Sequence, residues 1–495
     1  MQNVSLYLQH ILKQEGLPNY YNIGFYITET PHYLIISDVP VPLLNKEFRR
    51  KKVAYITPDD SDFLSHAGLV DINTSCWIPS EANCGKSNTG ESIILSEETE
   101  EGRYILIPFN TKQVLKHRGS TIKGFFLPAS KLPYEKVSST DRGGIRRLVI
   151  AAIQEIFRQK GIPYIRISYV PGNSPSLFGI RLDTDFCPLP VIKQAVNLAD
   201  KIGMRWTWFI NTGALASALK DLKSILAGQD IQIHCYRHWV YEQVDENRKN
   251  ISTARELLNK HGINPTGVAG PYGEWNINFQ RALEQLGIEY SSEFSYSYDD
   301  LPGRPIIDNQ KSPVVQIPVH PVSMGRLAWA KANHKAILKY YQGLIDRQVA
   351  RSEPCFIYDH PEWIVKYKEL WQDIIQYGKE RCGNWSTLTE YYQWWCGRER
   401  SSYTVIANGK DLEIKAEPPT REMSLVINYN GQKAVIPFSS ERINIDNLVW
   451  TEITYLKFNR LEVYTRRLPF SYLLYENLRE IRKQLILQKE KKERE

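Results

Sequence analysis

The 495-residue sequence lacks the features that mark several large classes of protein. It contains no apolar run approaching the ~18 residues that span a bilayer. Its seven cysteines are odd in number and include no CxxC pair, which argues against a disulfide framework and against a zinc knuckle. The first residues show no basic stretch followed by an apolar core, so we expect no signal peptide and a cytoplasmic location.

The sequence also lacks a dense basic run and a complete phosphate-binding loop. Its net charge of +7 is mild for this length, and part of it comes from local clusters such as residues 46–52. Nucleic-acid-binding proteins carry denser basic faces, so we expect no nucleic-acid partner. Gly85-Lys86-Ser87 resembles the end of a phosphate-binding loop, but Ser80 replaces the required first glycine, and we expect no phosphate site there.

The order of predicted elements divides the chain into four regions. Residues 1–140 mix short apolar runs with loops and predict an N-terminal α/β domain of unknown role. Over residues 141–400 strands and helices alternate, which indicates a parallel sheet, open or closed into a barrel. Residues 401–470 show short alternating runs with Asn-Gly turns, typical of a small, sandwich-like all-β domain. Residues 471–495 predict an amphipathic helix and a charged tail; we expect the helix to pack on the body, with a partner or membrane-surface helix as the alternative.

Two acidic residues, Asp183 and Asp185, follow the predicted strand in "LFGIRLDTDF". Residues i and i+2 of a strand point to the same side, and where the strand ends both carboxylates can face one cavity. Carboxylates placed so closely repel each other unless a cation or a shared proton relieves them. The alternative is a solvated pair that also caps the next helix.

Two histidines, His234 and His238, follow the apolar strand "DIQI" four residues apart. If these residues begin a helix, both rings lie on one face, which is the spacing of two-histidine metal sites. The imidazoles and the acidic pair would then meet on the same rim of the sheet. Two imidazoles and one carboxylate bind a metal and leave positions open for water. The alternative is that both rings pack into the core.

Two further segments fit the same rim. "AGPYGEWN", residues 269–276, predicts a turn that can offer backbone N–H groups to a developing oxyanion, unless it is an ordinary connection. "CFIYDHPEW" predicts a buried strand ending in His360, which can serve as a general acid or be structural. "QIPVHP" predicts a strand leading to His320, which we expect to be structural rather than part of the rim.

This ordered set resembles the NodB-type polysaccharide deacetylase superfamily, carbohydrate esterase family 4, over about residues 165–395. The resemblance implies a distorted (β/α) barrel of the deacetylase type. It also implies a metal-dependent hydrolase that removes an acetyl group from an N-acetylated sugar or polysaccharide. The expected partner is therefore an N-acetylated glycan or an aminosugar conjugate, and the sequence predicts no oligomeric state.

The resemblance assigns a role to each candidate residue. It implies one divalent metal, Zn²⁺ first with Co²⁺, Ni²⁺ or Mn²⁺ as alternatives, bound by Asp185, His234 and His238. Asp183 resembles the base that activates water, and His360 resembles the acid that protonates the leaving amine.

The Pro-Tyr-Gly turn carries both a match and a departure. Pro271 and Tyr272 resemble the oxyanion and substrate turn, in which the backbone N–H of Tyr272 helps to hold the oxyanion. The family places an arginine that pairs with the base two residues before the proline, and this sequence has Ala269 there. Arg181 and Arg237 are the candidates to replace that cation.

Two alternative functions follow. The Asp-x-Asp form is similar to the branch that acts on lipid-linked aminosugars, whereas "YSYDDLPGRP" resembles the branch with allantoinase- and cyclic-imide-type enzymes. A non-sugar amide hydrolase is therefore the first alternative. A catalytically impaired glycan-binding or assembly protein is the second, because of Ala269 and the large flanking regions.

Overall fold

A computed structural model of the chain describes residues 161–453 without a break. It also describes most of residues 115–159 and the shorter segments 6–17, 24–25, 32–36, 54–58, 95–99 and 102–107, with scattered residues after 453. The predicted surface loop with Gly85-Lys86-Ser87 lies outside the described residues.

The centre of the fold is a seven-stranded parallel sheet, as the alternation of strands and helices predicts. Its order is β16 (Val315–Gln316), β13 (Tyr290–Ser291), β12 (Gly267–Val268), β11 (Asp230–Ile233), β10 (Thr207–Ile210), β9 (Phe178–Asp183) and β17 (Cys355–Asp359). A parallel bridge from His320 to Ile357 joins the chain after β16 to β17, at the opposite edge. The sheet therefore curves into a half-barrel, and this bridge brings the chain that follows one edge strand beside the other edge strand.

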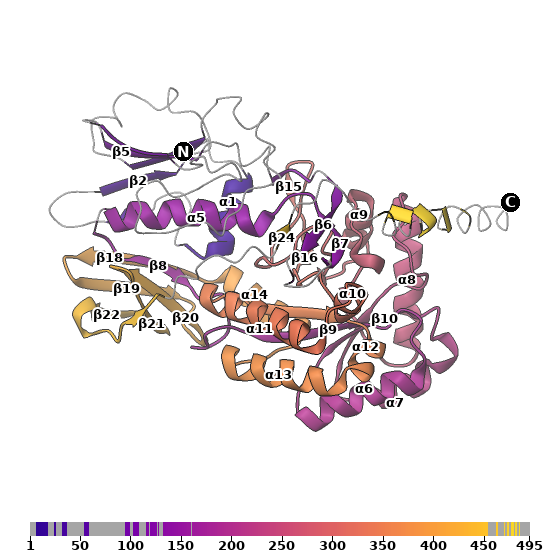
Figure 1. The fold of residues 1–495 in the computed structure, drawn as a ribbon. Helices are drawn as coiled ribbons and strands as arrows, with labels where there is room; N and C mark the ends of the chain where they lie inside the picture. Colours follow the sequence, from indigo (N-terminus) through magenta and orange to yellow (C-terminus); the bar gives the residue numbers. More distant parts are fainter. Residues whose placement is uncertain are drawn as a thin grey trace.

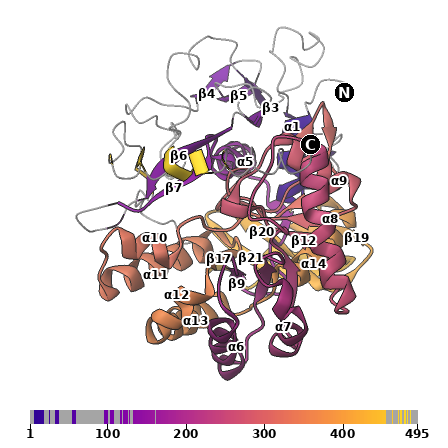
Figure 2. The same ribbon diagram turned by 90° about the vertical axis from the view of Figure 1, so that its right-hand side faces the viewer.

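Helices surround the curved sheet (Figure 2). They are α6 (Leu189–Ile202), α7 (Leu219–Ile225), α8 (Val244–Lys260), α9 (Ile277–Gln285), α10 (Met324–Trp329), α11 (His334–Arg351), α12 (Pro361–Lys366), α13 (Lys368–Cys382) and α14 (Leu388–Arg400). In α6 the buried residues Ile192, Ala195 and Ala199 recur at helical spacing, and the helix ends at Gly203 with φ 68°. Such an amphipathic helix with a left-handed glycine stop is what its sequence predicts.

Strand β9 is buried at all six positions, as expected for the middle of a parallel sheet covered on both faces. Its second residue is Gly179, and a Cβ there would lie 2.3 Å from the Phe356 ring of β17. Close packing thus requires glycine at that position. The strand also contains Arg181, whose side chain is fully buried and must find an anionic partner nearby.

The N-terminal part contains a mixed sheet in the order β1 (Gly24–Phe25), β2 (His32–Ile36), β3 (Ala54–Pro58), β5 (Gly102–Ile107) and β4 (Leu95–Thr99). Strands β2, β3 and β5 contain the apolar runs that predict strands in this region. The helices of this part are α1 (Leu6–Glu15) and α5 (Arg142–Gln159). A separate hairpin of β6 (Ser120–Phe125) and β7 (Tyr134–Ser138) pairs through β6 with β24 (Glu462–Val463).

The region after α14 forms antiparallel sheets, as its alternating pattern predicts. One sheet contains β18 (Ser402–Asn408), β19 (Asp411–Glu417) and β22 (Glu441–Asn444); the other contains β23 (Thr451–Glu452), β21 (Gln432–Phe438), β20 (Thr420–Tyr429) and β8 (Tyr164–Ile167). Asn430 and Gly431 both have positive φ, 49° and 79°, and close the β20–β21 hairpin with the two-residue turn that Asn-Gly favours.

The pairing of β8 is a finding that the sequence did not predict. This strand precedes the barrel in the chain but pairs antiparallel with β20, so the second antiparallel sheet contains a strand from before the barrel. These sheets and the N-terminal sheet lie on opposite sides of α5 (Figures 1 and 2). The boundaries at residues 140, 400 and 470 stay predictions.

The expectation that the C-terminal helix packs on the body is wrong for its described apolar residues. Those residues are helical and exposed, with Leu478 57% and Ile481 56% exposed. The apolar face is therefore available to something outside the body.

A buried charge cluster joins α5 to the barrel. Arg146 of α5 donates to Asp300 over 2.8 Å and also to Glu353, and all three side chains are almost fully buried. Arg147 donates to Glu353 over 3.1 Å. Burial raises the pKa of Glu353, but Arg146 and Arg147 outweigh this effect and lower it to about 2.

We predict that Glu353→Gln lowers the free energy of unfolding at pH 7 by about 3 kcal/mol, because it breaks a buried ion pair. The depressed pKa of Glu353 means that its ionised form stabilises the fold above its usual titration range, and that this contribution is lost as the pH falls toward about 2. The difference between the variant and the wild type, measured by thermal or denaturant unfolding, should therefore shrink on acidification.

Asp446→Asn is the matched control, since Asp446 pairs with Lys410 on the surface, where the two side chains are 58% and 62% exposed. We expect a loss below about 1 kcal/mol there. Equal losses in both variants, or a difference at Glu353 that does not change with pH, would contradict the assignment.

Candidate metal centre

The two acidic residues after β9 take different conformations. Asp183 is the last residue of the strand, and its side chain is almost fully buried. Asp185 lies beyond the strand in a left-handed conformation with φ 42°. The Asp185 side chain lies near the end of β11 in the same sheet, where it contacts His234, and it is 26% exposed.

The two histidines do not begin a helix, so that part of the expectation is wrong. Strand β11 ends at Ile233, and residues 234–243 form a loop before α8. The chain reverses at Cys235, which has φ 62°. Asn250 of α8 fixes the loop by accepting from the Arg237 N–H over 2.6 Å and donating to the carbonyl oxygens of Arg237 and Trp239. The loop therefore brings the two rings together although the residues are not in a helix.

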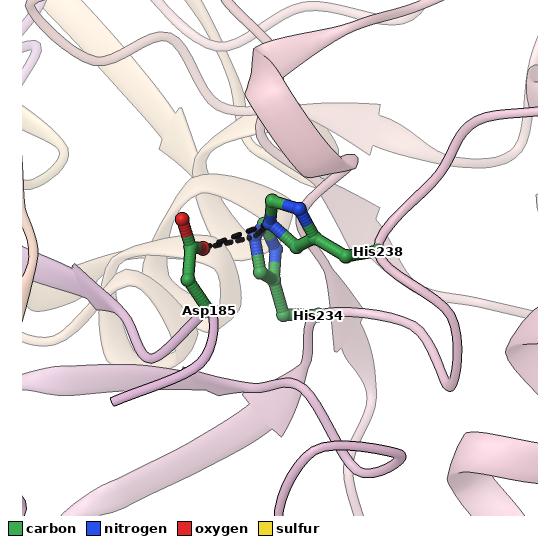
Figure 3. Close-up of side chains that lie close together, drawn as sticks. All are labelled: Asp185, His234 and His238. Atoms are coloured by element: carbon green, nitrogen blue, oxygen red, sulfur yellow. Dashed lines mark hydrogen bonds and ion pairs between the residues drawn. The ribbon is translucent and has the colours of Figure 1, made fainter. Parts of the chain in front are cut away.

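Asp185, His234 and His238 converge (Figure 3). The Asp185 Oδ1 atom lies 3.0 Å from the Nε2 atom of His234 and 2.9 Å from that of His238. The two Nε2 atoms are 3.1 Å apart. One oxygen and two nitrogens thus form a nearly equilateral triangle, and the group could hold a metal ion.

The chemistry of these donors fits a divalent cation. The Nδ1 atom of His234 lies 2.8 Å from the carbonyl oxygen of Ala269, which can only accept, so Nδ1 carries the proton and Nε2 presents a lone pair. Two imidazole nitrogens and a carboxylate oxygen suit zinc and similar ions, and a tetrahedral site with bonds of about 2.05 Å places donors about 3.3 Å apart. The observed separations are close to that value.

Asp183 stands beside the three donors and is held by Arg181. The guanidinium donates to both carboxylate oxygens, over 2.8 Å from Nε and 2.6 Å from Nη2, and also donates to the backbone oxygen of Ser292. Burial raises the pKa of Asp183, but Arg181 and then His234 outweigh it and lower that pKa below the usual range. Asp183 is therefore ionised and fixed in orientation, 4.0 Å from the Nε2 atom of His234.

The pairing of Arg181 with Asp183 places a cation beside the candidate base, although Ala269 stands where the family has its arginine. Arg181, one of the two candidates, supplies the cation from within β9, whereas the Arg237 side chain is exposed. Ala269 itself contributes its backbone, because its carbonyl fixes the tautomer of His234. Any side chain at that position can provide that contact.

His360 lies on the other side of Asp185. It follows β17, and its Nε2 atom is 3.4 Å from the second oxygen of Asp185. Its Nδ1 atom is 3.7 Å from Asp359, a fully buried carboxylate that also accepts the N–H groups of His360 and Met324. Burial lowers the pKa of His360, but Asp185 and Asp359 outweigh it and raise that pKa well above its usual range. A cation on Asp185 would offset part of this effect.

The Pro-Tyr-Gly turn borders His238. Pro271 is buried, and Tyr272 has φ 58° and places its ring 4.7 Å from the His238 ring, centroid to centroid. Glu293 stabilises the turn, because its carboxylate accepts a hydrogen bond from the Gly270 N–H over 3.0 Å. Burial raises the pKa of Glu293 to about 7. The structure thus brings together all seven candidate residues of the sequence analysis, while their individual roles stay predictions.

Three residues at this site had no signal in the sequence. Glu293 is one, because its contact with the turn spans 23 positions. Phe186 is another: it is 69% exposed, and its ring lies edge-on to His238 at 5.3 Å. The third is Arg479, whose guanidinium lies 4.6 Å from the centre of the Tyr272 ring. The exposed Phe186 ring beside the donors offers a stacking surface.

His320 lies away from these residues, as expected for a structural histidine. It is buried, and its ring nitrogens contact Asp299 at 2.9 Å and the Tyr340 hydroxyl at 2.8 Å. Asp299 and Asp300, the acidic pair of "YSYDDLPGRP", are thus engaged with His320 and Arg146 rather than with the candidate metal centre.

The polysaccharide deacetylase family model matches residues 180–291, which contain β9 to β13 and therefore Asp183, Asp185, His234 and His238. This match confirms the family that the ordered motifs indicate. No curated protein matches the sequence.

Solved structures of related description cover a little under half of this chain at low identity. A Mycobacterium smegmatis protein assigned to the polysaccharide deacetylases is 15% identical and has a TM-score of 0.41, covering 48% of this chain and 96% of its own. The chitin deacetylase of Colletotrichum lindemuthianum is 14% identical with a TM-score of 0.33, covering 45% and 89%. A family 4 pseudoenzyme from Bacillus anthracis is 13% identical with a TM-score of 0.32, covering 45% and 68%.

We predict that Asp185→Ala and His238→Ala each reduce the bound metal from about one ion per chain to near none after dialysis, because two remaining donors hold such an ion weakly. Elemental analysis of the purified protein measures this content. Circular dichroism should show that the fold is retained.

Asp245→Ala is the matched control, since the Asp245 side chain is 83% exposed and lies on α8, away from the triangle of donors. We expect its metal content to equal that of the wild type. A stoichiometric ion that remains in Asp185→Ala would show that the ligand assignment is wrong.

Proposed function

The chain carries a domain of the polysaccharide deacetylase family over residues 180–291, and on this basis we propose that it is a metal-dependent hydrolase that removes an acetyl group from an N-acetylated sugar or polysaccharide. The observation that supports this most strongly is the triangle of Asp185, His234 and His238 beside the ionised Asp183. Metal ligands alone are compatible with a storage or structural ion, whereas a fixed carboxylate next to them provides a base.

In the proposed reaction Asp185 is a metal ligand and Asp183 is the general base. A divalent ion held by Asp185, His234 and His238 supplies a Lewis acid that makes water more acidic and polarises a carbonyl oxygen. Asp183 accepts the proton of the attacking water, which it can do because Arg181 keeps its oxygens oriented and unprotonated. Asp185 serves as ligand, since its Oδ1 atom lies 3.0 Å and 2.9 Å from the Nε2 atoms of the two imidazoles.

The departing nitrogen needs a proton, because an amide nitrogen is a poor leaving group without one. His360 is the proposed donor: it is partly exposed toward the site and lies on the other side of Asp185 from His234 and His238. The backbone N–H of Tyr272 is the proposed partner of the developing oxyanion, an interaction typically worth about 3–4 kcal/mol. The exposed Phe186 ring beside His238 is the proposed contact for a sugar ring.

The two alternatives differ in what they require. A ureide or cyclic-imide hydrolase would use the same residues on a different amide. The acidic pair that resembles that branch is engaged in buried structural contacts, which favours the sugar amide. An impaired glycan-binding protein would lack an oriented base, whereas Arg181 orients Asp183 in spite of Ala269.

We predict that the metal-loaded protein releases acetate from a member of a panel of N-acetylated glycans that includes chitooligosaccharides and nucleotide-linked aminosugars. Removal of the metal with a chelator should abolish release, and added Zn²⁺ or Co²⁺ should restore it. Hydrolysis of allantoin without acetate release would favour the first alternative. Tight metal binding with no hydrolysis of any amide would favour the second.

We further predict that Asp183→Asn lowers kcat about 10²–10⁴-fold, which is the range typical of a lost general base. Its metal content should stay near that of the wild type, because Asp183 is not among the three ligands. A variant with normal kcat would show that another group takes the proton.

Arg181→Met tests how the base is held. We expect kcat to fall roughly a hundredfold through loss of orientation, with metal retained. In an Asp183→Asn background the same substitution should have no further effect, since Arg181 acts through Asp183. Additive losses in the double variant would indicate that Arg181 acts independently of Asp183. Thermal unfolding of all three variants separates this effect from loss of the fold.

A further inference from the structure

The C-terminal segment touches the border of the candidate metal centre. Arg479 donates to Glu274 over 2.9 Å, and the two side chains are only 9% and 15% exposed. The same guanidinium lies 4.6 Å from the centre of the Tyr272 ring, and that ring contacts His238. The segment is thus anchored next to the turn that borders a metal ligand.

The other side of this segment is apolar and exposed. The residues Leu474, Leu478, Ile481 and Leu485 are helical and 46%, 57%, 56% and 60% exposed. Their spacings of four, three and four residues place them within an arc of about 60° on a helix of 100° per residue, and Arg479 lies about 130° from the middle of that arc. The helix is therefore anchored through one face and presents a continuous apolar stripe on another.

The charge of this part of the sequence indicates which partner covers the stripe. Residues 457–495 contain eleven Lys and Arg and six Glu, a net charge of +5 out of +7 for the whole chain. A second copy of the same stripe would bring two cationic segments together, which is unfavourable. An anionic lipid surface attracts such a segment and also takes up its apolar side chains.

We propose that the C-terminal helix docks the protein on an anionic membrane surface, with Leu474, Leu478, Ile481 and Leu485 inserted among the lipids. Within the described part of the chain, no helix is long and apolar enough to cross a membrane. On such a surface the helix would lie in the interface, with its apolar side chains among the lipids and the basic residues of the segment near the headgroups.

The contacts of Arg479 determine where the candidate metal centre lies when the helix is bound to a membrane. Because Arg479 ties the helix to Tyr272 and Glu274, docking brings the mouth of the metal centre close to the lipid headgroups. If the proposed function holds, the substrate class is an N-acetylated sugar presented at a membrane surface. Membrane binding itself does not depend on that function.

The test is co-sedimentation of the full chain with phosphatidylcholine vesicles, with and without phosphatidylglycerol. We expect binding to the anionic vesicles, weaker binding at high salt, and little binding to phosphatidylcholine alone. Leu478→Ser with Ile481→Ser should lower the bound-to-free ratio at least about tenfold, because two exposed apolar side chains are lost. Arg482→Gln with Lys483→Gln should weaken binding mainly at low salt.

The matched control is Ile406→Ser with Val449→Ser, which removes two exposed apolar side chains elsewhere, 41% and 85% exposed. It should bind vesicles as the wild type does. The proposal is overturned if the wild type does not bind anionic vesicles, or if the helix variant and the control bind alike. It is also overturned if the helix variant changes only the self-association of the protein, measured by analytical ultracentrifugation, because the occupant is then a second copy.

Metal content and acetate release from soluble glycans, measured on the same helix variant, separate the two proposals. Both should equal the wild type, since neither Leu478 nor Ile481 lies among the groups assigned to the reaction. Vesicle binding without acetate release from any substrate would leave the membrane proposal standing and remove the proposed function. Acetate release without vesicle binding would do the reverse.

Discussion

The bidentate pairing of Arg181 with Asp183 is the interaction on which the rest of the site depends. A guanidinium inside a strand that is buried on every side must be neutralised, and Asp183, two residues on, is positioned to do so. Once both oxygens of Asp183 are oriented by Arg181, Asp185 is the carboxylate that faces the two imidazoles. Two acids two residues apart thus acquire separate environments and can carry separate roles.

The sequence predicted the members of the site better than their conformations. Acids and histidines that follow parallel strands must meet on one rim, and this argument needs only the strand order, which the alternation of strands and helices supplies. The helical spacing of His234 and His238 was misleading, because a loop pinned by Asn250 brings the rings together instead. Spacing identified the right residues, while hydrogen bonds from the helix that follows the loop set the geometry.

What could not be predicted depends on contacts between distant segments. Strand β8 has the pattern of a buried strand, but nothing in that pattern indicates that its partner is β20, some 260 residues later in the numbering. Glu293 and Arg479 reach the Pro-Tyr-Gly turn from outside any local motif. Whether the C-terminal apolar stripe packs on the body or stays exposed is likewise set by tertiary contacts, which no local pattern reports.

The segment from Glu293 to Asp300 links the site to the elements that precede the barrel. At one end Glu293 holds the turn through Gly270, and at the other Asp300 accepts from Arg146 of α5. Between them the carbonyl oxygen of Tyr296 accepts from Arg142, also of α5. Disturbing α5 should therefore move the turn that borders His238, even though α5 contributes no atom to the metal centre. Helix α5 therefore stabilises the site indirectly. Its arginines Arg142 and Arg146 hold the segment that positions the turn beside His238, and the barrel strands alone do not fix that turn.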